Sequence, residues 1–297
     1  DNPNFKLVKK DIRDLNVKDF EGIDIVCDLA SLSNDPCGEL DQKLTYSINH
    51  LGRANVAVLA KKAAVKQYIL SSSCSVYGSG ISSLLTEESE AFPVSTYAKA
   101  NCKVEEDVFA LADNKFFVTA LRQATVFGLS KRMRFDLAIN MMTLNAVQKG
   151  RIFVMGGGTQ WRPFIHVNDA ARAFILVMGK EASIINKQKF NVGGSGQNYN
   201  ILSLAYVVRE NIPFPIDIEI VPDDADKRDY NVSFEKIKNS LGFEPRVTPG
   251  SGVKEIYEAL KQGTVDTGIK TVTVRWYKHI AEAKQLMDDL ILNDRLM

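Results

Sequence analysis

The sequence predicts an α/β protein built on a doubly wound parallel sheet, with a smaller substrate-binding lid domain in its C-terminal part. Up to residue 193, apolar stretches of strand length alternate with stretches of helical spacing. Such strand-helix-strand units imply right-handed crossovers and a parallel sheet. After residue 193 the pattern changes to shorter pieces and ends in a long amphipathic helix, which indicates a different and smaller unit.

Strands are expected where short apolar runs stand between polar turns. Residues 5–9 form the first candidate. Residues 23–29 form the second, which is apolar apart from Asp24 and Asp28, as expected for a strand buried on both faces of a parallel sheet. Further strands are expected at residues 67–70, 116–121 and 190–192.

Helices are expected in the segments between these strands. Residues 41–62 have apolar side chains at helical spacing, namely Leu44, Ile48, Leu51, Val56 and Leu59. A second helix begins at about Tyr97. Further helices are expected at residues 132–149, 168–178, 253–262 and 273–292.

Composition favours small-molecule chemistry. The 297 residues can fill a large core, and 37 basic against 36 acidic residues leave a charge of +1, so we expect neither a nucleic-acid nor a membrane partner. Four cysteines and three histidines show no metal-ligand spacing, so we expect no metal and reduced thiols. Without an apolar run of spanning length or a signal-peptide core, we expect a cytoplasmic protein.

The stretch at residues 67–103 carries the candidate chemistry. It reads QYILSSSCSVYG, then a polar loop, then STYAKANCK. In an open α/β sheet, ligands bind beyond the carboxyl ends of the strands, which is where these serines lie. Ser73 and Tyr97 are therefore the first candidate catalytic residues.

This arrangement resembles the extended short-chain dehydrogenase/reductase family, in particular its NAD-dependent nucleotide-sugar epimerases and dehydratases. In that family a serine or threonine of an SSxxxVYG segment works with the tyrosine of a YxxxK motif. Ser73 and Tyr97 match these positions, and Asn101 stands where the family has lysine. The resemblance implies a Rossmann-like sheet, NAD or NADP as cofactor, a nucleotide-sugar substrate and a homodimer.

The resemblance also implies two interleaved domains. Residues 1–126 and 167–193 would form the dinucleotide-binding domain, and residues 127–166 and 194–297 the lid. Segments similar to the family's cofactor-binding segments are the DIRD segment, the end of the second strand, the following helix and the third strand. The cofactor-binding residues expected from these are Asp11, Ile12, Leu29, Ala30, Ser31, Asn49 and Ser71, together with Tyr97.

In the family, a strand, a Gly-rich turn and a helix come before these segments, and the turn holds the pyrophosphate of the dinucleotide. The sequence has no such fingerprint before residue 5. We therefore expect the intact polypeptide to extend upstream of Asp1. The glycine clusters at residues 156–158 and 193–196 are interpreted as loops of the lid.

Three further residues match positions that contact the nucleotide sugar. Arg162 in QWRPFIHVND and Arg228 in DKRDY are similar to two arginines that grip the diphosphate, and Asn140 in FDLAINMM matches a nucleotide-contacting position. Guanidinium groups suit phosphate oxygens because they bind them in bidentate fashion. As isolated residues they would be ordinary surface charges. His166 is interpreted as structural.

Two departures from the family bear on the reaction. A tyrosine base needs a pKa below its ordinary value of about 10, and a neighbouring ammonium would provide this, whereas Asn101 carries no charge. Family dehydratases have an acidic pair after the catalytic threonine, where this chain has Cys74 and Ser75. Loss of water is therefore disfavoured, and epimerisation or keto-reduction fits better.

Two functional hypotheses follow. The first is an NAD(P)-dependent enzyme that acts on a nucleotide-linked sugar, with Tyr97 as base, Ser73 as hydrogen-bond donor and Asn101 contributing to cofactor placement. The second is a catalytically degenerate family member that binds nucleotide or nucleotide sugar without turnover. Asn101 and the missing Gly-rich fingerprint favour the second hypothesis. For Tyr97 alone, the alternative interpretation is a packed tyrosine at the start of a helix.

Overall fold

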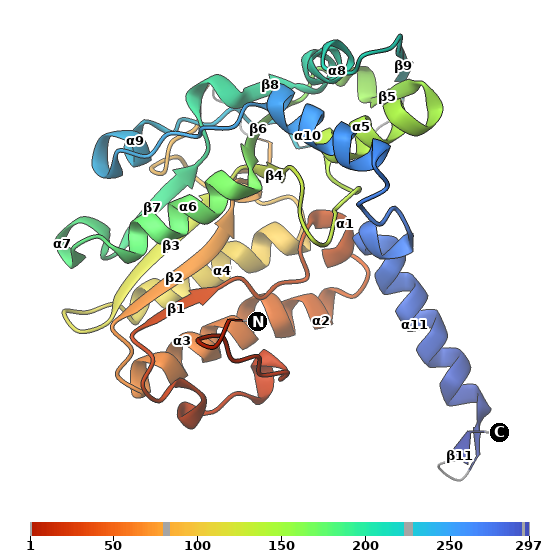
Figure 1. Ribbon diagram of the computed structural model, residues 1–297. Coiled ribbons are helices and arrows are strands. Elements are labelled where there is room, and N and C mark those ends of the chain that lie inside the picture. Colours follow the sequence, from red (N-terminus) through yellow and green to blue (C-terminus); the bar gives the residue numbers. More distant parts are fainter. Residues whose placement is uncertain (1, 80–83, 223–227, 293–294, 297) are drawn as a thin grey trace.

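Four parallel strands form the main sheet, which we describe from a computed structural model that covers residues 2–79, 84–222, 228–292 and 295–296. The spatial order is β1-β2-β3-β7 (Figure 1). The strands are β1 (Ile25–Asp28), β2 (Gln67–Ser73), β3 (Phe117–Gln123) and β7 (Gln188–Val192). The predicted α/β class and parallel sheet are confirmed.

Helices cover both faces of this sheet. α3 (Arg53–Lys62) and α4 (Thr96–Ala110) pack on one face, and α6 (Val167–Met178) packs on the other (Figure 1). Side chains alternate accordingly, since Tyr68 and Leu70 of β2 belong to the core on the α3 and α4 side and Ile69 to the core on the α6 side. The sheet is thus doubly wound, and its carboxyl ends point towards the remaining part of the chain.

That remaining part carries smaller sheets, β4-β6-β8 and β5-β9, and its own apolar core. The strands are β4 (Thr125–Phe127), β5 (Arg151–Met155), β6 (Trp161–His166), β8 (Asn198–Asn200) and β9 (Asp217–Val221). The helices of this part are α5 (Ala138–Lys149), α8 (Ile201–Glu210) and α10 (Pro249–Lys261). Two short helices, α7 (Ala182–Ile185) and α9 (Glu235–Leu241), pack instead against β3 and β7 of the main sheet.

Short elements complete the chain. Before α3 lie η1 (Ile12–Asp14), η2 (Val17–Phe20), α1 (Asp35–Gly38), α2 (Gln42–Tyr46) and the π-helical η3 (Ser47–Gly52). After it lie η4 (Cys74–Tyr77), η5 (Gly156–Gly158), η6 (Ser195–Gln197), η7 (Ile269–Thr271), α11 (Thr273–Leu290), β10 (Ile291–Leu292) and β11 (Arg295–Leu296).

Two predicted elements are wrong in part. Residues 5–9 form no strand, and Phe5 and Leu7 are 70% and 79% exposed, because a strand needs a neighbouring backbone and β1 pairs here with β2. The helix predicted from residue 132 begins only at Ala138. Residues 132–137 instead form a loop that places Met133 and Phe135 in a small buried cluster with Ile256.

The buried face of the segment at residues 41–62 also differs from the prediction. Leu44 and Leu51 are 38% and 61% exposed, whereas Asn49 and Arg53 are buried. The π-helical turn of η3 inserts an extra residue between α2 and α3, which rotates the following side chains relative to a regular helix. Polar side chains are therefore directed at the sheet, close to the carboxyl end of β1.

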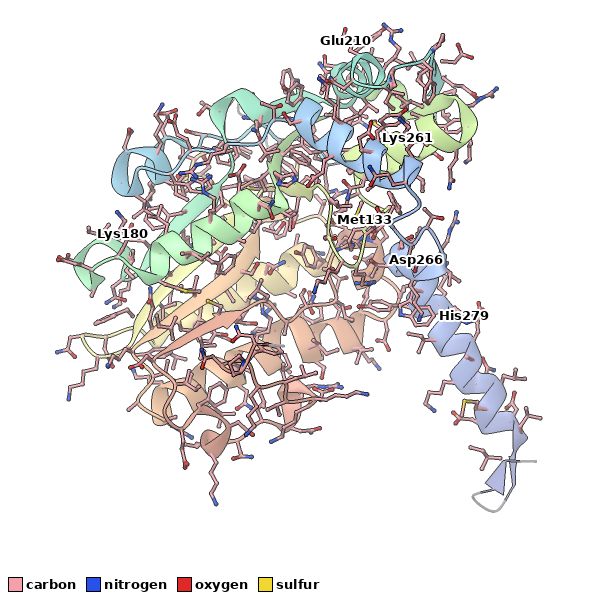
Figure 2. All side chains as sticks on the ribbon, in the orientation of Figure 1. Met133, Lys180, Glu210, Lys261, Asp266 and His279 are labelled. Carbon is pink, nitrogen blue, oxygen red and sulfur yellow. The ribbon has the colours of Figure 1, made fainter. Side chains whose placement is uncertain are left out.

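Side chains fill the space between the sheet and its helices, whereas α11, on which His279 lies, extends away from that body (Figure 2). Among the residues that the structure describes, no helix combines the length and the apolar character needed to cross a bilayer.

Candidate active site

Ser73 and Tyr97 line one cavity at the carboxyl end of β2. The cavity has a volume of about 200 Å³, and its other lining residues include Ser71, Gln123 and Arg228. Ser73 ends β2 and caps η4, where its hydroxyl oxygen accepts a hydrogen bond from the Ser75 backbone N–H at 3.1 Å. Tyr97 lies in the first turn of α4. The fold therefore brings together the two residues first singled out in the sequence.

Two glycines allow the close packing around this cavity. Gly78, which ends the SSSCSVYG segment, has φ +61°, and a Cβ there would lie 1.8 Å from the Phe92 carbonyl oxygen. At Gly38 a Cβ would lie 3.0 Å from the Cβ of Tyr97. The turn after β2 therefore needs glycine at position 78, and the small residue at position 38 lets α1 approach the helix that carries Tyr97.

The surroundings of Tyr97 raise the pKa of its hydroxyl. Burial is the largest cause, and the negative charge of Asp35 adds to it. The positive charge of Arg53 and the side chains of Asn101 and Ser73 act in the opposite direction. An acidic side chain of α1 and a basic side chain of α3 thus have opposite effects on the pKa of Tyr97.

Asn101 is buried at 1% exposure and contacts this basic neighbour directly. Its Oδ1 accepts a hydrogen bond from Arg53 Nη1 at 3.3 Å, and its Nδ2 donates to the Tyr97 backbone carbonyl at 3.1 Å. Arg53 is equally buried and donates from Nε to Asp28 Oδ2 at 2.8 Å. A guanidinium group therefore lies beside the position where the family has a lysine.

Three side chains near the ends of the strands have buried polar atoms without a hydrogen-bond partner among the residues that the structure describes. These are the hydroxyls of Ser31 and Ser75 and the amide of Gln123, which follow or end β1, β2 and β3. Ser75 and Gln123 line the cavity of Ser73 and Tyr97. Buried polar groups need partners, so this edge of the sheet fits the polar ribose and amide groups of a dinucleotide.

The other residues predicted to bind the cofactor have different surroundings. The Asn49 amide is buried and exchanges hydrogen bonds with the backbone of Leu32, so it holds the loop that follows β1. Asp11 is exposed and pairs with Arg13 at 2.7 Å, and Ile12 packs beneath it against the core. Of the remaining residues in that loop, Leu29 is 62% exposed and Ala30 is partly buried.

Arg162 and Arg228 line a second cavity, of about 270 Å³, which shares Asn34, Thr125, Leu137 and Arg228 with the first. Arg228 forms an ion pair with Asp35. The guanidinium of Arg162 lies 5.1 Å from the centre of the Tyr230 ring and donates to the Trp161 carbonyl at 2.7 Å. Two arginines far apart in sequence thereby line one cavity, next to the cavity of Ser73 and Tyr97.

Asn140 has a structural environment. Its Oδ1 accepts from the Gly128 backbone N–H at 3.1 Å, and its Nδ2 donates to the Arg134 carbonyl at 3.1 Å. Arg134 in turn pairs with Asp136 at 2.8 Å and donates to the Ser33 hydroxyl at 2.9 Å. Asn140 thus fixes the loop that faces Tyr97 across the cavity.

Sequence reasoning missed Arg53, Asp28 and Asp35. The sequence contained a signal for Arg53 and Asp28, because Asp28 interrupts an apolar strand and a buried carboxylate needs a partner. Arg53 also precedes Val56 and Ala57 at helical spacing, on the face that is buried. No comparable pattern pointed to Asp35.

No group of three or more histidine, cysteine, aspartate and glutamate side chains that could hold a metal ion occurs in the described part of the chain. The four cysteines are free thiols. Cys74, next to Ser73, is fully buried, and its burial raises the pKa of the thiol far above the ordinary value.

Comparison with known proteins decides the family. The model of the NAD-dependent epimerase/dehydratase family matches residues 2–193. The chain belongs to this family. NAD is the cofactor of NAD-dependent epimerases and dehydratases, and the resemblance inferred from the SSSCSVYG and STYAKAN segments is confirmed. The homodimer and the cytoplasmic location stay predictions.

Curated relatives of this epimerase/dehydratase chain have several activities. UDP-glucuronic acid decarboxylase 1 of Arabidopsis thaliana is 25% identical over 262 residues, which cover 85% of this chain and only 58% of the relative. dTDP-glucose 4,6-dehydratase of Streptomyces niveus is 26% identical over 263 residues, covering 86% and 76% of the two chains. The chain thus spans less than two thirds of the first of these relatives.

Solved structures support the same fold. UDP-glucuronic acid 4-epimerase from Bacillus cereus, in complex with UDP-glucuronic acid and NAD, superposes with a TM-score of 0.79 at 21% identity, covering 88% of this chain and 83% of that one. The dTDP-glucose 4,6-dehydratase DesIV from Streptomyces venezuelae gives a TM-score of 0.78 at 22% identity, covering 89% and 83%.

Proposed function

We propose that the protein is an NAD-dependent enzyme that modifies a nucleotide-linked sugar by epimerisation or keto-reduction, with Tyr97 as base. One observation carries this proposal: Ser73 and Tyr97 line a single cavity at the carboxyl end of β2, and the neighbouring cavity lined by Arg162 and Arg228 shares Arg228 with it. A reactive centre beside a site for phosphates is the arrangement that a nucleotide-sugar enzyme needs.

In this proposal NAD, when bound, accepts hydride from a sugar carbon and can return it. Tyr97 takes the proton from the sugar hydroxyl, and Ser73 donates a hydrogen bond to the same oxygen as the carbonyl develops. Asn101 holds the backbone at Tyr97 through its contact with the Tyr97 carbonyl at 3.1 Å. The Arg162 and Arg228 guanidinium groups bind the diphosphate, for which Arg228 would exchange its ion pair with Asp35.

The cofactor would lie along the ends of β1 and β2. Ser31, Ser71, Ser75 and Gln123 offer it polar atoms, and Asn49 keeps the loop after β1 in place. Asp11 and Ile12 would bind the adenine end, with Leu29 and Ala30 beside the pyrophosphate. Asn140 would act on the nucleotide indirectly, by fixing the loop at Arg134.

Loss of water is disfavoured by the residues after Ser73. An eliminating enzyme needs an acid that can protonate the departing hydroxyl. Cys74 is fully buried with a strongly raised thiol pKa, and Ser75 carries an alcohol. Neither is a useful acid near neutral pH.

A second candidate is a binding protein without turnover. The observation that favours it is the raised pKa of Tyr97, which opposes its use as a base. The cavity and its arginines would then retain a nucleotide or nucleotide sugar unchanged.

Binding and turnover measured on the same samples separate the two candidates. NAD binding is followed by calorimetry, and conversion of UDP- and dTDP-linked hexoses by NMR, in the wild type and in Tyr97→Phe. We expect turnover in the wild type and a loss of at least about 100-fold in Tyr97→Phe, with NAD affinity nearly unchanged, because only the phenol oxygen is removed. NAD binding without any turnover in the wild type would favour the second candidate, and equal turnover in both proteins would exclude Tyr97 as the base.

A further inference from the structure

The guanidinium of Arg53 is held in one orientation by hydrogen bonds on all its edges. Nε donates to Asp28 Oδ2 at 2.8 Å, and Nη2 donates to the carbonyl oxygens of Asp28 at 3.2 Å and Ser71 at 2.7 Å. The remaining edge, Nη1, donates to Asn101 Oδ1 at 3.3 Å. The guanidinium group of Arg53 therefore binds a carboxylate on the β1 side. Its opposite edge faces α4, the helix that carries Tyr97.

Residue 101 has the chemistry of an acceptor in this network. An asparagine oxygen can receive the Nη1 proton, and the amide nitrogen is left to donate to the Tyr97 carbonyl, as observed. A lysine has donors only and would place a second positive charge against the guanidinium. The residue that differs from the family motif thus matches the cation beside it.

We propose that Arg53 is a positioning residue that supplies to Tyr97, from α3 and across Asn101, the positive charge that a lysine at position 101 would otherwise supply. The catalytic use of this charge rests on the proposed function. The effect of Arg53 on the titration of Tyr97 can be measured in the protein alone, without substrate. Arg53 partly offsets the burial and the negative charge of Asp35 that disfavour the Tyr97 phenolate, while Asn101 fixes the helix backbone.

Other charged and titratable groups face the same end of α4. Asp35 opposes Arg53 in its effect on Tyr97, and Tyr97 also interacts with Arg134 across the cavity. The further groups on elements packed against the start of α4 are Asp28 of β1, Cys37 of α1, Glu39 after α1, Tyr68 of β2 and Arg228, which is paired with Asp35.

Two variants separate the effect of Arg53 from that of its counter-ion Asp28. Asp28→Asn removes the counter-ion and keeps the guanidinium, so the pKa of Tyr97 should fall. Asp28→Asn with Arg53→Met removes both charges without leaving a carboxylate unpaired, so the pKa of Tyr97 should rise above that in Asp28→Asn. The Tyr97 pKa values of these two variants should differ by about one pH unit or more, which corresponds to a tenfold change in the phenolate fraction at a given pH. Adding Asn101→Lys to the double variant should lower the value again.

The measurement is an NMR titration of ring-labelled tyrosine without substrate, in which the Tyr97 signal is assigned by its loss in Tyr97→Phe. A matched control is Glu105→Gln with Arg122→Met, which removes another buried ion pair, joined at 2.7 Å, from α4 and β3. It should leave the Tyr97 titration unchanged. If the Asp28 and Arg53 double variant does not fold, Asp28→Asn alone still decides, since an unchanged or raised pKa overturns the inference.

Failure of this inference and failure of the proposed function have different signatures. An unmoved titration in an enzyme that converts nucleotide sugars overturns the role of Arg53 and leaves the function standing. A titration that moves as described in a protein without turnover supports the role of Arg53 and refutes the proposed reaction.

Discussion

Replacing Asn101 by lysine, the residue type of the family's YxxxK motif, should destabilise this protein. The buried Asn101 side chain accepts a hydrogen bond from Arg53 Nη1 at 3.3 Å. An ammonium placed at about 5 Å from the guanidinium, at an effective dielectric constant of about 20, would be repelled by about 3 kcal/mol. Loss of the two amide hydrogen bonds adds about 1 kcal/mol each. We therefore expect Asn101→Lys to lower the free energy of unfolding by about 3–5 kcal/mol.

Chemical denaturation at several pH values measures this loss. Burial beside a cation depresses the pKa of the introduced amine in the folded state, so the penalty is complete at low pH. It decreases as the pH rises from the depressed folded value towards the unfolded value of about 10.4. Asn101→Met is the neutral control and should cost only the lost hydrogen bonds, about 1–2 kcal/mol.

A double-mutant cycle with Arg53→Met, in the Asp28→Asn background, isolates the repulsion. Asn101→Lys should cost at least about 2 kcal/mol less when the guanidinium is absent. An Asn101→Lys protein as stable as Asn101→Met, or a penalty that does not depend on Arg53, would refute the reasoning.

Two further variants test the framework of the site. Glu105→Gln should cost about 3–5 kcal/mol in a urea titration, because it leaves Arg122 buried without its carboxylate. Burial alone would raise the pKa of Glu105, but Arg122 and Ser72 lower it overall. The contribution of Glu105 to the free energy of unfolding is therefore complete above its unfolded pKa of about 4.3, and it is lost as the pH falls through the folded pKa. A wild type whose stability is constant through that acidic range would contradict this. Gly78→Ala should destabilise by at least about 1 kcal/mol, since its Cβ would lie 1.8 Å from the Phe92 oxygen, whereas a neutral result would mean that the turn can relax.

The fold and the centre of the site could be predicted because both depend on local patterns. Apolar runs at residues 67–70 and 116–121 predicted two neighbouring parallel strands, and the SSSCSVYG segment placed Ser73 at a strand end. Arg162 and Arg228 were predicted from their motifs, and both line one cavity in the structure.

Other features depend on tertiary contacts that no local pattern contains. The π-helical turn of η3 exposes Leu51 and buries Arg53, against the regular spacing of apolar residues in that segment. Sequence reasoning therefore treated Asn101 as a lost charge, because the cation that contacts it lies 48 positions earlier in the chain. Asp35 is likewise brought to Tyr97 only by the packing of α1 against α4.

The mass of the product formed from a nucleotide-linked sugar tests the central claim most directly. Wild-type protein is incubated with NAD and a nucleotide-linked hexose, or with the reduced cofactor and a keto sugar, and the products are analysed by mass spectrometry. Epimerisation leaves the mass unchanged with a new NMR spectrum, and keto-reduction adds two hydrogens; we expect one of these results, and neither with Tyr97→Phe. Loss of water or of carbon dioxide, or the same product from Tyr97→Phe, would contradict the account.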